Sequence, residues 1–391
     1  MTHHVDVVSL FAGVGGIDLG LRRGDARLRT VLFCEINDDA QNVLREHFPG
    51  VPIHGDVRTL DRLPPTTRVV TAGSPCCDFS SANASKVGID GKKSSLLREV
   101  FRLLQGAEHV EHVVIENVAN MLHLRNGQAM AELGRELASL GFSYAFRIVD
   151  CRAFGLRQRR RRLVCIAQRG ARVPGWLLAT SATPPAENKG IPKSFAGFSW
   201  VDGNRGCSFL FDVTPTIRAH DTPLYIQSQP AIIRPASGHV GILSAEDGEA
   251  LQGLPVGWTA CVDGRRRFAR IGNSVPVSIF EWIGRHLLRS IQSLNGLQSI
   301  STPDAHSGRR VRVAVAGIGG PGQDLRRVPH VTEWPQLPQE RQSSPLATRP
   351  LSDRAIRGFL NRAVKGKSGM PDWALKSLRE ELTRREVATS L

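Results

Sequence analysis

The strongest constraint on the fold is an alternation of short apolar runs with helical patterns over residues 1–168. Six strands rich in Val, Ile and Leu are expected at Val5–Phe11, Val31–Glu35, Val69–Ala72, Val113–Glu116, Tyr144–Val149 and Leu163–Ala167. Helical stretches lie between them at Asp38–His47, Ser95–Gln105 and Gly127–Leu140. Strands with near-continuous apolar sequences are typical of sheets that helices cover on both faces. The pattern therefore predicts an α/β domain with a doubly wound sheet.

A change of composition after residue 170 divides the chain. Residues 171–241 are rich in Pro, Gly, Ser and aromatic residues and show no clear helix, which predicts an irregular or β-rich second domain. Helical periodicity returns over 242–294, and this stretch is expected to rejoin the first domain, residues 1–170. A Ser-, Pro-, Gly- and Arg-rich linker is expected over 295–350, followed by a C-terminal helical module over 351–391.

Charge and cysteine usage limit the classes of function. The chain carries 51 Lys and Arg against 36 Asp and Glu, a formal net charge of +15, which favours a polyanionic partner such as nucleic acid over a merely solvated basic surface. Its 7 cysteines form no C-x-x-C spacing, which argues against a zinc motif and suits free thiols in a reducing compartment. No stretch approaches about 20 apolar residues, so a cytoplasmic protein without membrane association is expected.

A glycine-rich turn, Phe11-Ala12-Gly13-Val14-Gly15-Gly16, follows the first expected strand. Glycines at this place let the backbone approach a ligand at the carboxyl edge of the sheet, although structural turns also use glycine. Glu35 closes the second strand, where an acceptor for ribose hydroxyls is expected, and Asp56 follows the next apolar run. Each carboxylate could instead be a cap or turn residue, but together they describe a pocket suited to adenosine.

Two adjacent cysteines, Cys76 and Cys77, stand in the sequence GSPCCDFS after the third expected strand. Pro75 ends that strand, so the pair is expected on a loop at the ligand-bearing edge of the sheet. Burial is the common fate of cysteine, whereas a vicinal disulfide is strained and zinc lacks ligands at a suitable spacing. The interpretation that remains is a nucleophilic thiolate, which requires charged or acid–base side chains nearby as partners.

Two further segments offer such partners. The fourth strand ends in Glu116-Asn117-Val118, which places a carboxylate on the same edge. The sequence GLRQRRRR then precedes the last expected strand. Alternate residues of a strand point the same way, so Gln158, Arg160 and Arg162 are expected to converge, although a basic run is also typical of a solvated face.

Taken in order, these motifs resemble those of the C5-cytosine DNA methyltransferases. SLFAGVGG is similar to the S-adenosylmethionine loop of that family, and GSPCCDFS to its G-x-P-C-Q-x-F-S nucleophile loop, with Cys76 as the nucleophile. ENV, QRRRR, LQGLP and GNSV resemble further family motifs. The resemblance covers residues 5–170 and 242–290.

Three residues depart from the family pattern. Cys77 stands in place of glutamine, Arg157 in place of a common proline, and Ala250 in place of the arginine before the L-Q-G-F-P element. These departures concern packing around the target base. Each predicted catalytic group is present in the sequence.

The resemblance implies a Rossmann-like S-adenosylmethionine-dependent methyltransferase with a target-recognition domain at 171–241 and a short C-terminal extension. The implied substrate is double-stranded DNA, the implied by-product is S-adenosylhomocysteine, and no metal is expected. The implied catalytic residues are Cys76, Glu116, Arg160 and Arg162. The implied cofactor residues are Phe11, Gly13, Gly15, Gly16, Glu35, Ile36, Asp56, Val57, Pro75, Leu96, Asn273, Ser274 and Val275. The implied DNA contacts are Ser80, Lys86, Lys92, Lys93, Gln158, Gln252 and Gly253.

The resemblance also implies covalent catalysis on a flipped base. The Cys76 thiolate attacks C6, Glu116 stabilises N3 and the exocyclic amine, Arg160 and Arg162 supply positive charge, and C5 takes the methyl group. A cytosine inside a stacked duplex is out of reach, so the base is expected to be extruded and covered by the loop at 80–93. Arg265-Arg266-Arg267 either lines the DNA cleft or forms a solvated turn.

Other functions remain open at this point. An RNA cytosine methyltransferase could use the same scaffold, and a DNA-binding regulator could retain the fold without activity. A nicotinamide-dependent oxidoreductase would explain the glycine turn but not GSPCCDFS together with ENV and QRRRR. For the enzyme we expect a monomer in the cytoplasm, associated with the nucleoid on DNA. It is either linked to a cognate restriction endonuclease as a further partner or a solitary (orphan) methyltransferase.

Overall fold

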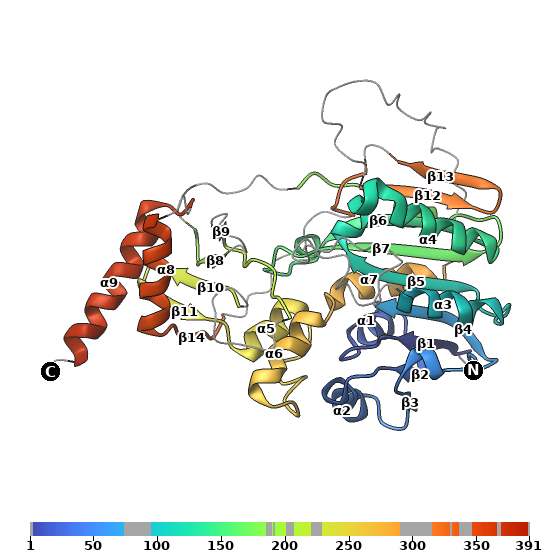
Figure 1. The fold of residues 1–391 in the computed structure, drawn as a ribbon, viewed down its shortest axis with the longest axis horizontal. Coiled ribbons are helices and arrows are strands. Elements are labelled where there is room, and N and C mark those ends of the chain that lie inside the picture. Colours follow the sequence, from blue (N-terminus) through green and yellow to red (C-terminus); the bar gives the residue numbers. More distant parts are fainter. Residues whose placement is uncertain are drawn as a thin grey trace, which may run out of the picture. The chain divides into compact units, whose positions relative to one another are not determined.

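The computed structural model describes residues 3–73, 95–184, 190, 192–200, 207–219, 229–289, 315–328, 331–335, 346–365 and 369–389. The chain divides into two compact units (Figure 1). Unit 1 comprises Met1–Phe154, Arg161–Pro184 and Val277–Pro338. Unit 2 comprises Gly155–Arg160, Pro185–Pro276 and Gln339–Leu391. Each unit is therefore assembled from three separate stretches of sequence.

Unit 1 is built on a mixed sheet with the strand order β13-β12-β6-β7-β5-β4-β1-β2-β3 (Figure 1). Its parallel half consists of β1 (Val5–Leu10), β2 (Leu28–Cys34), β3 (Ile53–His54), β4 (Thr67–Gly73) and β5 (His112–Val118). Strand β7 (Arg161–Arg169) runs antiparallel to β5, and β6 (Phe142–Asp150), which is antiparallel to β7, returns to the direction of β5. All six predicted strands are thus confirmed. The strand order reverses at β1, and such switch points are where sheets of this kind bind ligands.

The helices of unit 1 follow the strands as the apolar periodicity predicts. They are α1 (Gly16–Gly24), α2 (Asp38–His47), α3 (Ser95–Gln105), α4 (Gln128–Ser139) and α7 (Val277–Leu287). Short 3-10 helices occur at Val57–Thr59, Ala119–Gly127, Cys151–Phe154 and Gly175–Leu177. One face of the sheet buries a large apolar cluster that includes Val70, Leu104 and Phe146.

Helix α7 packs closely on α1 because two glycines face it. A Cβ atom on Gly24 would lie 2.3 Å from the carbonyl oxygen of Glu281, and one on Gly20 would lie 2.5 Å from that of Val277. The return to the first domain, predicted over 242–294, is therefore seen for α7. Residues 242–276 belong to unit 2 instead.

The predicted linker at 295–350 contains regular structure where it is described. Strands β12 (Ala316–Gly320) and β13 (Gln323–Arg327) form a hairpin that extends the sheet of unit 1 beyond β6. The strand-like alternation RVRVAVA at 310–316 ends at the first residue of β12 and lies largely outside the described residues. Arg147 on β6 holds the neighbouring segments, because its buried guanidinium donates to the carbonyl oxygens of Thr332 (2.8 Å) and Leu177 (2.9 Å).

Unit 2 contains an antiparallel sheet with the order β14-β11-β10-β8-β9. Its strands are β8 (Ala196–Trp200), β9 (Cys207–Phe211), β10 (Ala231–Arg234), β11 (His239–Ile242) and β14 (Arg349–Pro350). Strands β8 to β10 and all but the last residue of β11 lie within the range 171–241, whereas residues 171–184 of that range belong to unit 1. Helices α5 (Ala245–Gln252) and α6 (Gly264–Asn273) belong to the same unit.

The C-terminal helices α8 (Asp353–Lys365) and α9 (Asp372–Thr389) complete the core of unit 2. Ile356, Phe359 and Leu378 pack in one buried cluster with Phe198 and Ile233 of the sheet. Residues 351–391, predicted as a separate module, therefore share a core with the strands of 196–242. Without the helices, this face of a small sheet would be exposed to water.

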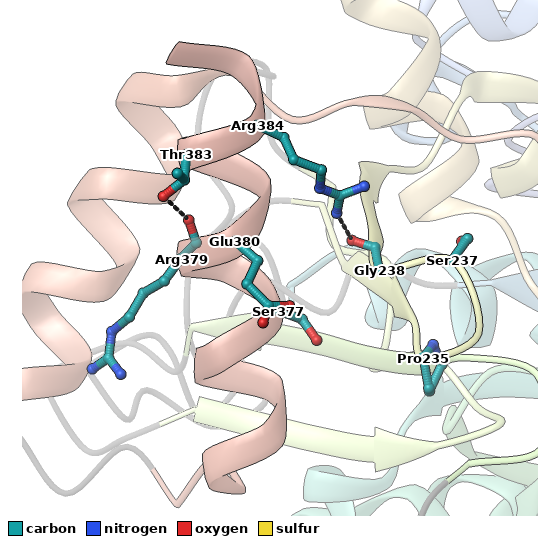
Figure 2. A pocket seen from close by; sticks show the side chains of 8 residues that line it. All are labelled: Pro235, Ser237, Gly238, Ser377, Arg379, Glu380, Thr383 and Arg384. Atoms are coloured by element: carbon teal, nitrogen blue, oxygen red, sulfur yellow. Dashed lines mark hydrogen bonds between the residues drawn. The ribbon is translucent and has the colours of Figure 1, made fainter. Parts of the chain in front are cut away.

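Helix α9 also lies beside the turn that joins β10 to β11, as Figure 2 shows. Arg384 donates a hydrogen bond of 3.1 Å to the carbonyl oxygen of Gly238 in that turn. An open groove of about 620 Å³ runs between the two, lined mainly by arginine, glutamate and hydroxyl side chains. It contains none of the residues predicted for the functional site.

Candidate active site

The glycine turn predicted to bind a cofactor lies at the switch point of the sheet in unit 1. Gly15 caps α1 with φ of 76°, and a Cβ atom there would lie 2.6 Å from the ring of Phe48, so this position requires glycine. The backbone N–H of Gly13 donates to Oε2 of Glu35 at 2.8 Å. The end of β2 and the glycine turn are thereby joined, as the sequence predicted.

Glu35 and Ile36 present different chemistry at this edge of the sheet. The second oxygen of Glu35 accepts a hydrogen bond of 2.8 Å from the backbone N–H of Asn37, which fixes the carboxylate in the loop. Ile36 is 66% exposed, which is unusual for a large apolar side chain. A carboxylate beside an exposed apolar side chain and a glycine turn suits the ribose and purine of a nucleoside.

The other predicted cofactor residues of unit 1 have mainly structural surroundings. Asp56 caps the 3-10 helix at Val57–Thr59, and its hydrogen bond from Arg58 lowers the pKa of the carboxyl below its usual range. Val57 is buried in the core, and Leu96 and Phe11 pack against the same cluster while partly exposed. The cap predicted as the alternative role of Asp56 is therefore present.

Glu116 and Arg162 meet at the carboxyl end of β5. Oε1 of Glu116 lies 2.8 Å from Nε of Arg162, and their side chains are only 10% and 12% exposed. Glu116 is also the register partner of Gly73, the last residue of β4. Cys76 follows only three positions after Gly73 in the sequence.

Several predicted residues lie outside the described part of the chain. They are Pro75, Cys76, Ser80, Lys86, Lys92 and Lys93. Their roles remain predictions. Two of the described cysteines are poorly suited to nucleophilic attack, because burial raises the pKa of the Cys34 and Cys165 thiols to about 12.

Arg160 does not converge with Arg162 as the strand alternation predicted. Strand β7 begins at Arg161, so Arg160 precedes the strand and belongs to unit 2. Its buried guanidinium donates to the carbonyl oxygens of Ile217 (2.9 Å), Gly272 (2.8 Å) and Ser274 (2.6 Å). In this structure Arg160 organises the backbone of unit 2, whereas Arg162 contacts the carboxylate of unit 1.

Gln158 and Gln252, predicted to contact DNA, are fully buried in unit 2. Gln158 accepts from the N–H of Ile217 (3.0 Å) and donates to the carbonyl of Leu251 (3.1 Å). Gln252 donates to the carbonyl of Ile271 at 2.9 Å. Both side chains are buried and bound to backbone groups in this structure, and their assignment to DNA remains a prediction.

The remaining predicted residues in unit 2 follow the same pattern. Gly253 ends α5 with φ of 74°. Ser274 and Val275 are buried, whereas Asn273 is exposed at the end of α6. The segments QRRRR, LQGLP and GNSV are therefore joined by buried hydrogen bonds, and Arg160 accounts for much of that connection.

Two buried carboxylates were missed by the sequence reasoning. Glu249 in unit 2 accepts from the N–H groups of Gly257 (2.6 Å) and Thr259 (2.8 Å) and pairs with Arg267 at 2.8 Å. This pairing occupies Arg267, one of the three arginines considered for the DNA cleft. The other carboxylate is Asp18 on α1. The sequence could have indicated it, because this aspartate lies on the apolar face of a helix that starts at a glycine turn.

No group of three or more His, Cys, Asp and Glu side chains in the described residues could hold a metal ion. None of the helices that the structure describes is long and apolar enough to cross a bilayer.

The sheet order and the switch-point turn define a Rossmann-like S-adenosylmethionine-dependent methyltransferase fold. The S. pombe Dnmt2 methyltransferase matches with a TM-score of 0.55 at 15% identity, covering 73% of this chain and 98% of that one. The Entamoeba histolytica methyltransferase EhMeth matches with a TM-score of 0.50 at 14% identity, over the same shares.

Sequence relatives identify the family within this class. Residues 5–193 match the family described as C-5 cytosine-specific DNA methylase. The chain is 34% identical over 377 residues to the type II methyltransferase M2.BsuMI of Bacillus subtilis (strain 168), covering 92% of this chain and 93% of that protein. The chain belongs to the C-5 cytosine-specific DNA methylases and is a DNA (cytosine-5-)-methyltransferase. Membership implies S-adenosylmethionine as the methyl donor.

Proposed function

We propose that the protein methylates C5 of a cytosine flipped out of a specific duplex sequence, through a covalent bond between Cys76 and C6 of the base. The observation that carries this proposal is the ion pair of Glu116 with Arg162 beside Gly73, at the point where β4 leads toward Cys76. A carboxylate and a guanidinium next to a thiolate supply the groups that attack on a pyrimidine requires.

The glycine turn and the end of β2 are proposed to hold the donor. Glu35 would accept the ribose hydroxyls, Ile36 would cover one face of the adenine, and Gly13 to Gly16 would allow close approach of the backbone. When bound, S-adenosylmethionine supplies an electrophilic methyl group. The chain's own part is to position that group and to exclude water.

The proposed reaction uses the side chains in a fixed order. The Cys76 thiolate forms a bond to C6, and the displaced electron pair makes C5 nucleophilic. Glu116 holds the exocyclic amine and shares a proton with N3, and Arg162 offsets the carboxylate charge and binds the base carbonyl. After C5 is methylated, water removes its proton and the electron pair expels Cys76 from C6.

Arg160 is assigned a different role from the one the sequence suggested. We propose that it positions the segment at 272–275 rather than touching the base, because its donors are bound to backbone carbonyls. Unit 2 is proposed as the target-recognition domain, and it includes α8 and α9 in addition to residues 185–241.

A pair of cysteine variants tests the proposal. Cys76→Ala is expected to abolish methyl transfer to DNA, while Cys77→Ala keeps substantial activity. DNA containing 5-fluorocytosine is expected to trap a covalent adduct that survives denaturation, because fluorine blocks the final loss of a proton. An indispensable Cys77, or active enzyme without an adduct, would refute the assignment. The same assay with an RNA substrate tests the alternative that the protein methylates cytosine in RNA.

The name of the relative in Bacillus subtilis supports a place in a restriction-modification system. We propose a monomer, located with the nucleoid in the cytoplasm, whose target sequence is shared with a cognate restriction endonuclease. Expression in a host that lacks cytosine methylation, followed by mapping of 5-methylcytosine, would reveal that sequence. A map without methylated sites would contradict the proposal.

A further inference from the structure

A buried hydrogen-bond network joins α1 to three strands of unit 1, with Asp18 at its centre. Asp18 is 2% exposed on the first turn of α1. Ser9 on β1 donates to Oδ2 of Asp18 at 2.9 Å, and Thr30 on β2 donates to Oδ1 at 2.7 Å. Thr71 on β4 donates to the hydroxyl of Ser9 at 3.1 Å. The network therefore crosses the three strands that form the switch point.

The other contacts near the beginning of α1 are apolar. Ile17 is buried, and Gly15, which caps the helix without a side-chain hydrogen bond, lies against Phe48. The close packing on α7 involves Gly20 and Gly24, further along the helix. Asp18 supplies side-chain hydrogen bonds that join the first turn of α1, next to Gly15 and Gly16, to β1 and β2.

A carboxylate is a costly choice for a purely structural contact at this place. Burial raises the pKa of Asp18 from 3.8 to about 6, although the hydroxyls of Thr30 and Ser9 and the charge of Arg22 act in the opposite direction. An apolar side chain of similar size would avoid the desolvation of a charged group. The network is therefore better explained by a need for fixed geometry than by stability.

We propose that Asp18 is a positioning residue for cofactor binding: by tying the first turn of α1 to β1 and β2, its carboxylate fixes the glycine turn in the geometry that binds S-adenosylmethionine. This inference rests on the proposed function of the glycine turn. Asp18 itself contacts strands and not the ligand, so its effect should fall on affinity and not on the chemical step.

The test is calorimetric binding of S-adenosylhomocysteine to the full-length protein. Asp18→Ala is expected to weaken binding about 10-fold, and Thr30→Val about 3- to 5-fold, the effect of one lost hydrogen bond. Asp18→Asn should stay close to wild type, because an amide can bond both hydroxyls. The kcat at saturating S-adenosylmethionine should be unchanged in all three, while KM for S-adenosylmethionine follows the binding constant.

Thr67→Val is the matched control. Thr67 lies on β4 of the same sheet, and its buried hydroxyl has no hydrogen-bond partner within the described part of the chain. It should leave binding unchanged. The inference is overturned if Thr67→Val weakens binding as much as Thr30→Val, if Asp18→Ala binds like wild type, or if Asp18→Asn loses as much as Asp18→Ala. If Asp18→Ala fails to fold, the binding of S-adenosylhomocysteine to Thr30→Val and Asp18→Asn still tests the inference. A wild-type protein that does not bind S-adenosylhomocysteine would instead refute the proposed cofactor site itself.

Discussion

The two units bury their cores in different ways. Unit 1 stacks strands and helices that follow one another along residues 5–169, and α7 and the β12–β13 hairpin are added to it from farther along the chain. In the helix-and-sheet core of unit 2, eight of the twelve buried residues come from 351–382, more than 100 positions after the strands. Unit 2 therefore depends on its C-terminal helices, while the main sheet of unit 1 is encoded locally.

The same contrast divides the polar groups. In unit 1 the paired charges of Glu116 and Arg162 lie at the edge of the sheet, beside the strand that leads toward Cys76. In unit 2 the paired charges of Glu249 and Arg267 hold a loop, and Arg160 holds backbone carbonyls. The first arrangement suits chemistry, and the second maintains a shape. Substitutions that look alike should therefore have different effects in the two units.

The largest effect is expected from Glu116→Gln. Loss of the acidic group should lower kcat for methyl transfer about 10²- to 10⁴-fold. The matched substitution in unit 2, Glu249→Gln, should instead lower the free energy of unfolding by about 3 kcal/mol, because it breaks a buried ion pair. Methylation kinetics and urea denaturation distinguish the two. A Glu116→Gln enzyme with normal kcat would contradict a catalytic role of the charged pair in unit 1.

A core substitution tests the dependence of unit 2 on its C-terminal helices. Phe359 is fully buried on α8, with its ring 5.0 Å from that of Phe198. Phe359→Ala should lower the free energy of unfolding by about 3–5 kcal/mol, measured by chemical denaturation. Val387→Ala, at a side chain that is 55% exposed, is the control and should be nearly neutral. Equal effects would show that α8 does not belong to the core.

Asp18 gives unit 1 a distinct dependence on pH. Its folded-state pKa of about 6 lies above the ordinary value of 3.8, so the folded form retains the proton to higher pH. The stability contributed by the protonated form is fully present below about pH 4 and falls by about 3 kcal/mol in total as the pH rises through about 6. Asp18→Asn should therefore match wild type at pH 4 and be the more stable protein at pH 7, by thermal or urea unfolding. A constant difference across this range would contradict the expectation.

The smallest effect concerns the helix contact that brings α7 back to unit 1. Gly24→Ala places a methyl group 2.3 Å from the carbonyl oxygen of Glu281 and should cost about 1–3 kcal/mol of unfolding free energy. Gly106→Ala, where a Cβ atom meets nothing within 4 Å, should be neutral or slightly stabilising. Thermal unfolding of both variants would show whether the glycine contact is as close as the structure indicates.

The sequence by itself determined the parallel half of the sheet, the glycine turn and the place of Glu116 at the carboxyl edge. These follow from local periodicity and from a simple rule, that parallel strands bring their carboxyl ends to one edge. The antiparallel pairing of β7 with β5, which brings Arg162 to Glu116, was decided by the tertiary structure. The tertiary structure alone decided three further features. Arg160 binds backbone carbonyl groups of unit 2, Gln158 and Gln252 are buried, and the C-terminal helices share the core of unit 2. Arg160 binds carbonyl groups 57 to 114 positions away in the chain. A buried donor meets whichever backbone oxygen the packing brings to it, and no pattern of neighbouring residues specifies that partner.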